Sequence, residues 1–321
     1  MRLIILALNG VFDTGLSVLL DTFSTANELA MDQGFAVEPF EVRLVGLGGT
    51  VRTALGLSTI VESPNSVKQP DWVVVPAINA KQPERLIRAL DGEDVRQASA
   101  LLRTWYADRV GIAAACIGTF ILAEAGLLDG AEATTTWSLA PTFRQRYPSV
   151  KLDDARMLVT SNGVVTAGAM LGHLDLALWL VRQASPELAA LVARFMLIDK
   201  RSSQAAYIIP EYLAHADPLI ERFERWSRNR LAEGFSLQEA AKALAVGART
   251  LQRRTEAVLG KSPLAFFQDL RIERAKHLVS IGLDLDSIAG EVGYADAATL
   301  RTLLRRRLGR GVRELRADMQ R

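Results

Sequence analysis

The first part of the chain carries short apolar runs separated by stretches in which apolar positions recur at helical spacing. The runs typical of β-strands are Leu3–Leu8, Phe40–Val45, Trp72–Val75, Val110–Ala114, Ala133–Thr136 and Val164–Ala167. Helices are expected at Leu16–Met31, Pro83–Tyr106, Gly118–Ala125, Gly172–Gln183 and Pro186–Asp199. Apolar strands that alternate with helices predict an α/β fold, with a parallel sheet covered by helices on both faces. Ligands of such sheets bind beyond the carboxyl ends of the strands.

Strand-like runs stop after Gly168, and from Pro218 onward the patterning is helical throughout. Glycines punctuate this helical part, and the polar stretch at 200–204 is typical of the start of a linker. We therefore expect an α/β domain at 1–200, a linker at 201–217 and an all-α domain at 218–321.

A helix-turn-helix pattern occupies residues 236–259. Ser236 and Glu239 form a capping box at the start of a short helix. Gly247 marks a tight turn, and a second, basic helix is expected at Ala248–Val258. Its apolar positions face inward and its polar positions face outward.

The same unit recurs about fifty residues later, at 286–308. Asp286 is the expected N-cap of its first helix, Gly293 lies at the turn, and Asp296 caps a second basic helix. A long helix at Pro263–Ser280 joins the two units. The all-α domain is therefore expected to contain two helix-turn-helix units.

The two basic helices carry residue types that read DNA. A recognition helix fits the major groove and brings Arg, Gln or Thr to base edges, while neighbouring cations meet phosphates. Two such helices on a rigid connector can enter successive major grooves. The residues expected to face double-stranded DNA are Arg249, Thr250, Gln252, Arg253, Arg254, Thr299, Arg301, Thr302, Arg305 and Arg306. The alternative is a helical dimerisation module with a basic surface.

Charge is unevenly distributed along the chain. Residues 217–321 hold 20 basic and 14 acidic residues, a net charge of +6, whereas residues 1–216 carry a net charge of −4. A basic tail on a mildly acidic body favours a polyanion-binding module attached to another domain. Cys116 is the only cysteine, which excludes an internal disulfide and fits the cytoplasm. We expect no metal site, no cofactor and no membrane span, because the sequence lacks their patterns.

Particular residues of the C-terminal part match a known domain. They are RTLQR at 249–253, GKSP at 260–263, Arg271, Ala275, Leu278, Ile288, Ala289, Val292, Gly293, Tyr294, Gly309 and Arg316. In this order they resemble the AraC-type DNA-binding domain, which implies a transcription regulator. Gly247 stands where that family usually has a capping Ser, and Leu300 and Val312 stand where it favours Phe and Pro. A slightly weaker helix start and different packing of the second unit are expected.

Cys116 lies where an apolar strand runs into a small-residue turn and a helix. The dipole of such a helix lowers a thiol pKa, which suits a nucleophile. The stretch 116–137, with Asn9–Asp13, Val73–Pro76 and Thr166–Gly168, resembles the PfpI-like branch of the glutamine-amidotransferase-like superfamily. Together with the AraC-type tail it resembles the GlxA-type regulators, which implies a flavodoxin-like N-terminal domain.

Catalysis by Cys116 would need a base that is oriented by a third group. Ile117 and Thr136 stand where related proteins carry His, and His173 is expected to pack on, or cap, the helix near Gly172. We therefore expect no catalytic residues and no enzymatic activity. Two alternatives stay open: a cysteine-dependent amidase or glyoxalase-like hydrolase with an accessory helical domain, and a redox sensor that oxidises Cys116.

The resemblance implies instead a pocket at the strand ends that senses a small molecule. The residues that it places there are Asp13, Asn79, Cys116, Ile117, Thr136 and Trp137. Trp137 would supply an apolar or cation–π wall, and Asp13 would pair with an amine. The alternatives are a core Trp, an N-capping Asp and a cysteine that only fills apolar space. Related regulators often sense small nitrogenous metabolites and dimerise, so an effector of that class and a homodimer are expected.

Overall fold

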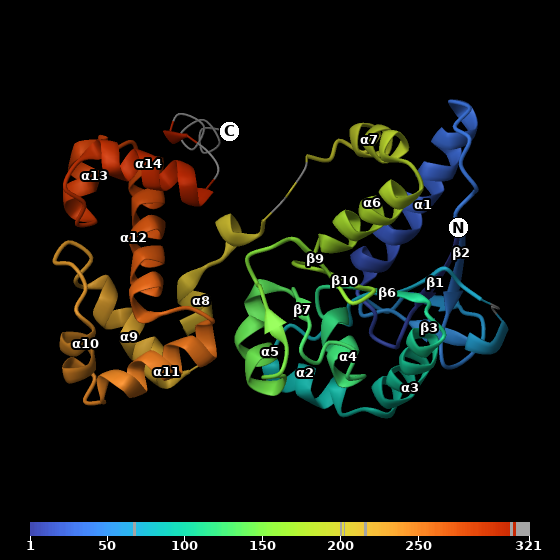
Figure 1. The fold of residues 1–321 in the computed structure, drawn as a ribbon, viewed down its shortest axis with the longest axis horizontal. Coiled ribbons are helices and arrows are strands. Elements are labelled where there is room, and N and C mark those ends of the chain that lie inside the picture. Colours follow the sequence, from blue (N-terminus) through green and yellow to red (C-terminus); the bar gives the residue numbers. More distant parts are fainter. Residues whose placement is uncertain (67–68, 200, 202, 215–216, 309–310, 313–321) are drawn as a thin grey trace. The chain divides into compact units, whose positions relative to one another are not determined.

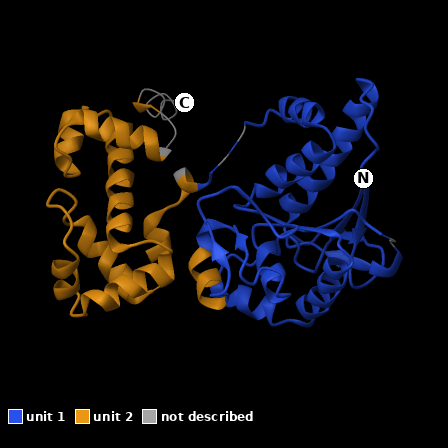
Figure 2. Ribbon diagram, viewed as in Figure 1, with its two compact units in different colours: residues 1–139, 147–204 blue, residues 140–146, 205–321 orange. Residues whose placement is uncertain are grey.

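The computed structural model describes residues 1–66, 69–199, 201, 203–214, 217–308 and 311–312 (Figure 1). Contacts along the chain separate two compact units (Figure 2). Unit 1 comprises residues 1–139 and 147–204, and unit 2 comprises residues 140–146 and 205–321. Within the described residues, no helix is both long and apolar enough to cross a membrane.

Unit 1 is built on a six-stranded sheet in the order β2-β1-β5-β6-β10-β9. The strands are β1 (Arg2–Leu6), β2 (Glu41–Val45), β5 (Trp72–Val75), β6 (Gly111–Ala115), β9 (Leu158–Ser161) and β10 (Val164–Ala167). Every neighbouring pair is parallel except β9 with β10. The predicted parallel sheet is confirmed, with an antiparallel edge strand that the apolar pattern did not reveal.

Helices cover both faces of this sheet (Figure 1). One face packs against α1 (Asp13–Asp32), α6 (Gly172–Ala184) and α7 (Pro186–Phe195). The other face carries α2 (Pro83–Leu90), α3 (Glu93–Ala107) and α4 (Gly118–Glu124). Successive side chains of a strand point to opposite faces, so a strand between two helix layers must be apolar throughout. Strand β10 accordingly buries all of its residues.

Several predicted elements have different limits. The helix expected at 83–106 is two helices, because the chain turns at Asp91 and enters α3 through an extended Gly92. The run Ala133–Thr136 is not a strand of the main sheet: only β7 (Glu132–Ala133) is a strand, and it pairs with β8 (Lys151–Leu152). The hairpin of β3 (Thr50–Arg52) and β4 (Ser58–Ile60) was not expected.

Other short elements complete unit 1. They are the 3₁₀ turns η1 (Pro64–Ser66) and η2 (Trp137–Leu139). Helix α5 (Ala140–Arg146), which follows η2, belongs to unit 2. Helix α7 ends at Phe195, four residues before the limit expected for the helix at 186–199.

Unit 2 is helical. After η3 (Ala205–Tyr207) come α8 (Pro210–Ala214), α9 (Pro218–Arg228), α10 (Leu237–Ala243), α11 (Ala248–Leu259), α12 (Pro263–Ser280), α13 (Leu285–Glu291) and α14 (Ala297–Leu308). Helix α12 has the limits predicted for the connecting helix. The fold class expected from the sequence, an α/β unit followed by an all-α unit, is confirmed.

Candidate functional site

The loops that follow the parallel strands are joined by hydrogen bonds at the carboxyl edge of the sheet. The backbone N–H of Phe12 donates to the carbonyl of Ala77 over 2.7 Å, and the N–H of Asn79 donates to Gly10 over 2.8 Å. These bonds tie the loop after β1 to the loop after β5. Two of the predicted pocket residues, Asp13 and Asn79, lie in or next to these braced loops.

Asp13 is the first residue of α1, and its half-buried carboxylate is only partly satisfied. Its Oδ2 accepts the backbone N–H of Leu55, in the β3–β4 loop, over 3.0 Å. Its Oδ1 is shielded from solvent and has no hydrogen-bond partner among the described residues. A buried carboxylate oxygen without a donor costs free energy, so this atom is a ready acceptor for a cationic or N–H-bearing ligand.

Cys116 occupies the expected elbow between β6 and α4, with the left-handed φ of 56° that such a sharp turn requires. Its side chain is buried, and burial raises the pKa of the thiol to about 11. The N–H of Ile117 and the hydroxyl of Thr136 face the thiol and offset only part of that rise. The prediction of a lowered pKa is wrong, because desolvation of the buried thiol outweighs the hydrogen bonds and the positive charge that favour the thiolate.

These contacts bring Cys116, Ile117 and Thr136 together, as the sequence predicted. Two residues that the sequence did not single out support them. The buried Thr135 donates its hydroxyl to the Cys116 carbonyl over 2.7 Å, and the positive charge of Lys81 acts on the thiol. The run of three threonines at 134–136 is the signal that could have identified Thr135.

The remaining predicted pocket residues differ in exposure. Trp137 opens η2 and is half-buried, next to the buried Thr136, whose Oγ1 lies 3.2 Å from the Oγ of Ser138. Asn79 is exposed, and the bond that fixes it comes from its backbone. Trp137 is therefore not a fully buried core residue.

His173 is buried in the first turn of α6, where the sequence placed it. Its Nε2 accepts the backbone N–H of Ala77 over 3.0 Å, so Nδ1 carries the proton and donates to the carbonyl of Met170 over 2.8 Å. Both ring nitrogens are therefore engaged by the backbone. Burial also lowers the pKa of His173 to about 4. The ring therefore braces the start of α6 against the loop after β5.

In unit 2, α10 and α11 form the first helix-turn-helix unit. Ser236 caps α10 by accepting the N–H of Glu239 over 3.3 Å, which agrees with the predicted capping box on that side. Leu251 is fully buried, and Gly247 precedes α11 without a side-chain cap. The inward and outward faces of the recognition helix are therefore those expected.

Helices α13 and α14 form the second helix-turn-helix unit around a compact apolar cluster, in which Leu300 and Leu304 are fully buried. Asp296 caps α14 by accepting the N–H of Thr299 over 2.7 Å, as predicted. The cap of α13 is Asp284 and not Asp286, which donates its own N–H to the Asp284 carboxylate. Val312 packs against the cluster, so the departures from the family pattern are accommodated. Gly309 and Arg316 lie outside the described residues.

Most of the predicted DNA-facing cations are available for an anionic partner. Five exposed arginines form no ion pair within the described part of the chain: Arg249, Arg253, Arg301, Arg305 and Arg306. Arg254 is different, because its guanidinium pairs with the buried carboxylate of Asp217. Gln252 donates to Glu256 on the same helix, and the hydroxyl of Thr302 donates to the carbonyl of Ala298.

A hollow of about 500 Å³ lies along α14. It is lined by Gln268, Tyr294, Ala298, Thr299, Thr302, Leu303 and Arg306. Three of these residues are among those predicted to face DNA. Helix α14 therefore contributes hydroxyl groups, apolar side chains and an arginine to a concave surface.

Residues 1–183 match the model of the DJ-1/PfpI family, which is more than half of the chain. The chain belongs to the DJ-1/PfpI family. Residues 240–318 match the model of a helix-turn-helix domain. The resemblance to PfpI-like and AraC-type proteins that the sequence suggested is confirmed for both parts of this DJ-1/PfpI protein.

Several curated relatives are HTH-type transcriptional regulators. HTH-type transcriptional regulator GbdR of Pseudomonas aeruginosa is 25% identical over 188 residues, 57% of this chain and 51% of GbdR. HTH-type transcriptional regulator CdhR of Pseudomonas aeruginosa is 28% identical over 196 residues, 58% of each chain. HTH-type transcriptional regulator GlxA of Rhizobium meliloti is 22% identical over 257 residues, 78% of this chain and 76% of GlxA. The chain thus spans about half the length of the first two relatives.

Solved structures agree on the fold of unit 1. A crystal structure of a protein from Vibrio parahaemolyticus, 20% identical, superposes with a TM-score of 0.52 over 61% of this chain and 98% of its own. At this identity the likeness concerns the fold alone.

Proposed function

We propose that this DJ-1/PfpI protein is a transcription regulator that binds double-stranded DNA through its two helix-turn-helix units. The observation that carries the proposal is a set of exposed arginines on the second helix of each helix-turn-helix unit, among them Arg253 on α11 and Arg305 on α14, that form no ion pair within the described part of the chain. An unpaired Arg on a recognition helix reaches base edges or phosphates without first breaking an ion pair. The relatives GbdR, CdhR and GlxA are HTH-type transcriptional regulators, which supports the same function.

The predicted interface comprises Arg249, Thr250, Gln252, Arg253, Arg254, Thr299, Arg301, Thr302, Arg305 and Arg306. We assign Arg254 a second task, because its guanidinium already neutralises Asp217, the buried cap of α9. The long helix α12 connects the two helix-turn-helix units and sets the distance between their recognition helices.

Unit 1 is, in this proposal, a sensor of a small nitrogenous molecule. Asp13 supports that ligand class, because its shielded Oδ1 lacks a donor that an ammonium or amide group would supply. Trp137 and the Cys116–Ile117–Thr136 cluster would form the apolar and polar walls. Asn79, which is exposed, would contribute at the rim.

The proposal excludes catalysis by Cys116. A thiol whose pKa lies at about 11 is almost entirely protonated near neutral pH, and the thiolate is the nucleophile. His173 has both ring nitrogens bonded to the backbone and does not act as its base. The same protonated, buried thiol argues against the redox sensor, which needs an exposed thiolate.

Three further features belong to the proposal. The protein acts as a homodimer in the cytoplasm, so that two pairs of helix-turn-helix units meet repeated half-sites. The sensing domain occupies residues 1–200 and the DNA-binding domain residues 218–321. Residues 201–217, which contain η3 and α8, connect them.

The proposal is tested by fluorescence-anisotropy titration of the full chain with a random-sequence DNA duplex at two salt concentrations. We expect affinity to fall steeply as salt rises, because each neutralised phosphate releases a counterion. No binding at low salt would overturn the proposal, and the protein would then be assayed as an amidase. For the sensor, small nitrogenous metabolites are tested for their effect on the thermal stability of the wild type. Those that raise it are then measured with Asp13→Ala. Equal stabilisation of both proteins would remove Asp13 from the pocket.

A further inference from the structure

Gln204 is the last residue of unit 1, and it is completely buried although it is polar and stands in a segment with a linker-like sequence. Its neighbours Ser203 and Ala205 are exposed. The backbone N–H of Gln204 donates to the carbonyl of Ala155 over 2.8 Å. The 205–321 segment of unit 2 begins at the next residue. The chain is therefore clamped into unit 1 immediately before it enters the DNA-binding unit.

The side-chain amide of Gln204 makes the clamp specific. Its Nε2 donates to the carbonyl of Thr135 over 2.9 Å, and lies 3.3 Å from both the hydroxyl of Thr134 and the carbonyl of Arg156. All three partners are acceptors on unit 1, so the amide orientation is fixed by chemistry. Ser203, by contrast, makes a bond to Ala155 from an exposed position.

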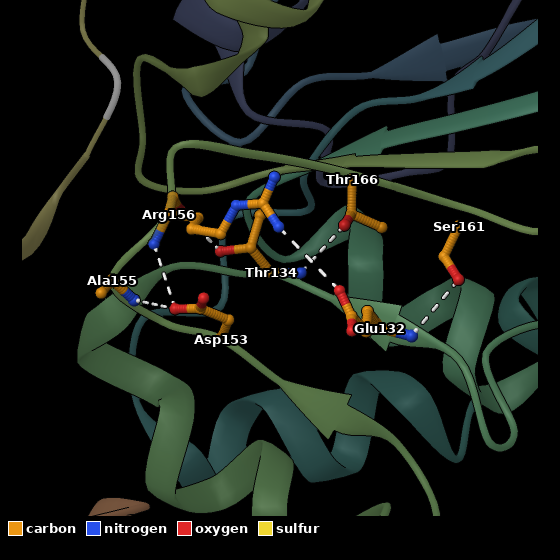
Figure 3. Close-up of polar contacts among 7 residues, drawn as sticks. All are labelled: Glu132, Thr134, Asp153, Ala155, Arg156, Ser161 and Thr166. Atoms are coloured by element: carbon orange, nitrogen blue, oxygen red, sulfur yellow. Dashed lines mark hydrogen bonds and ion pairs between the residues drawn. The ribbon is translucent and has the colours of Figure 1, made fainter.

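The receiving surface is rigidly held (Figure 3). The Asp153 carboxylate accepts the N–H of Ala155 over 3.0 Å and the N–H of Arg156 over 3.3 Å. Thr134 donates its hydroxyl to the Arg156 carbonyl over 2.9 Å and its N–H to the hydroxyl of Thr166 over 2.9 Å. This loop is braced from both sides. A movement of Thr135 relative to the loop therefore changes the hydrogen bond between the Thr135 carbonyl and the Gln204 amide.

Thr135 links Gln204 to the pocket. Its carbonyl accepts the Gln204 amide, and its hydroxyl donates to the carbonyl of Cys116 over 2.7 Å. Thr135 is completely buried, and its chain neighbour Thr136 belongs to the proposed pocket. On the other side, a Cβ at Gly168 would lie 2.2 Å from the Gln204 amide nitrogen. Gln204 thus touches the two segments that bound the Cys116 elbow.

The clamp is also poorly satisfied at one atom. The Oε1 of Gln204 is buried and has no hydrogen-bond partner among the described residues. A buried carbonyl without a donor lowers the stability of the clamped state. A small change in free energy can therefore release the Gln204 side chain from unit 1. An element with two arrangements close in free energy is what a coupling between two sites requires.

We propose that Gln204 relays the occupancy of the pocket to the DNA-binding unit. A ligand that shifts the Cys116–Ile117 or Thr135–Thr136 backbone changes the Thr135 carbonyl that holds the Gln204 amide. Ala205, which opens the 205–321 segment of unit 2, is then tethered or released. DNA affinity changes by the difference in ligand affinity between the two arrangements. The relay rests on the proposed function.

Because the effector is unidentified, a covalent probe replaces it. Methyl methanethiosulfonate transfers a methylthio group to the Cys116 thiolate and releases methanesulfinate. Cys116 is the only cysteine, so mass spectrometry reports complete and specific labelling, for which mildly alkaline pH is used. Binding to a duplex selected from a random library is then measured for the labelled and unlabelled full chain, with Cys116→Ala as the unlabelled control.

The relay variants are Gln204→Met, which removes the amide, and Gly168→Ala, whose methyl displaces it. Ser203→Ala is the matched control, because it removes a side-chain hydrogen bond to Ala155 in the same segment and leaves the Gln204 amide in place. Should Gln204→Met fail to give a cooperative thermal transition, Thr135→Val removes the bond to Cys116 instead.

We expect labelling to change the affinity for the selected duplex at least about five-fold in the wild type and in Ser203→Ala. In Gln204→Met and Gly168→Ala the change should fall below about two-fold. A response that persists in both relay variants overturns the relay and leaves the sensor intact. No response in the wild type contradicts the coupling of pocket to DNA binding itself, and so removes the proposed sensor and the relay together.

Discussion

The Nε2 of His173 accepts the backbone N–H of Ala77 across 3.0 Å, and this bond fastens the start of α6 to the loop after β5. The approach is so close that a Cβ at Gly15 of α1 would lie 2.7 Å from the same nitrogen. Three segments that are distant in the sequence thus meet at one neutral imidazole. The braced edge of the sheet depends on that ring staying unprotonated.

The stability of the protein should therefore fall in mild acid. Burial lowers the pKa of His173 to about 4, whereas an unfolded His titrates near 6.5, so between these values the unfolded state binds the proton and the native state does not. This contribution is present at pH 7 and is lost as pH falls toward 4, by about 3 kcal/mol in the free energy of unfolding. Urea titrations from pH 7 to pH 4 measure it.

The variant His173→Gln removes the titrating group. Its free energy of unfolding should therefore change less between pH 7 and pH 4 than that of the wild type, although the variant is less stable at pH 7. His277→Gln, at an exposed position on α12, is the matched control and should keep the wild-type pH dependence. Parallel pH profiles for the wild type and His173→Gln would refute the buried neutral imidazole.

The sequence pattern predicted where the Cys116 elbow lies in the fold, but it did not predict the direction of the pKa shift of its thiol. The strand-to-helix elbow at Cys116 follows from an apolar run that meets small residues, both local features. The sign of the thiol pKa shift does not, because burial comes from segments far along the chain, including Thr135 and Thr136. The helix dipole is visible in the sequence, whereas desolvation depends on the assembled fold.

Caps and short strands show the same limit. The sequence alone does not distinguish Asp284 from Asp286 as the N-cap, because both are aspartates near the start of α13. The extended backbone of Asp284, with ψ of 154°, makes it the cap. Strands β3 and β4 were missed because each has three residues and few buried positions. Gln204 stands in a polar stretch whose composition predicts a linker, and nothing local indicates that its amide is buried.

Arg254 and Asp217 should prove to be a structural pair. The Asp217 side chain is 4% exposed, and Oδ1 caps α9 by accepting the N–H groups of Leu219 over 2.8 Å and Ile220 over 3.2 Å. Removing Arg254, which is 56% exposed, leaves that carboxylate without its cation. Solvent screening limits the loss in Arg254→Ala to about 1 kcal/mol of unfolding free energy.

Arg253→Ala is the control for this measurement, because the neighbouring Arg253 is exposed and has no ion pair in the described part of the chain. Its unfolding midpoint in urea should equal that of the wild type. Asp217→Ala should cost more than Arg254→Ala, by about 1 kcal/mol for the lost cap. If Arg253→Ala and Arg254→Ala destabilise equally, the pair contributes nothing.

Arg253 and Arg305 should each contribute to DNA binding. We expect Arg253→Ala and Arg305→Ala to weaken binding to a selected duplex by about 1–3 kcal/mol if the side chain reads a base edge. An arginine that meets only phosphate should weaken binding to every duplex alike and reduce the salt slope by about one. Fluorescence anisotropy on selected and scrambled duplexes distinguishes the two cases.

Arg274→Ala provides the matched control, since Arg274 lies on α12 and pairs with Glu291. Its affinity for DNA should stay within about two-fold of the wild type. Unchanged affinity in both Arg253→Ala and Arg305→Ala would remove the recognition-helix assignment, and the basic helices would then serve the dimerisation module.

The reactivity of Cys116 tests the non-enzymatic interpretation most directly. With a thiol pKa of about 11, the thiolate fraction at pH 7.5 is roughly 0.03%, so alkylation by iodoacetamide should be very slow. The rate should rise about tenfold per pH unit up to about pH 10, whereas the thiol of the urea-unfolded chain should level off near pH 8.5–9. Since Cys116 is the only cysteine, the mass of the alkylated chain reports this site alone. Fast alkylation of the folded protein near neutral pH, with a plateau below pH 8, would mean a stabilised thiolate. The hydrolase and the redox sensor would then regain the support that burial of Cys116 denies them.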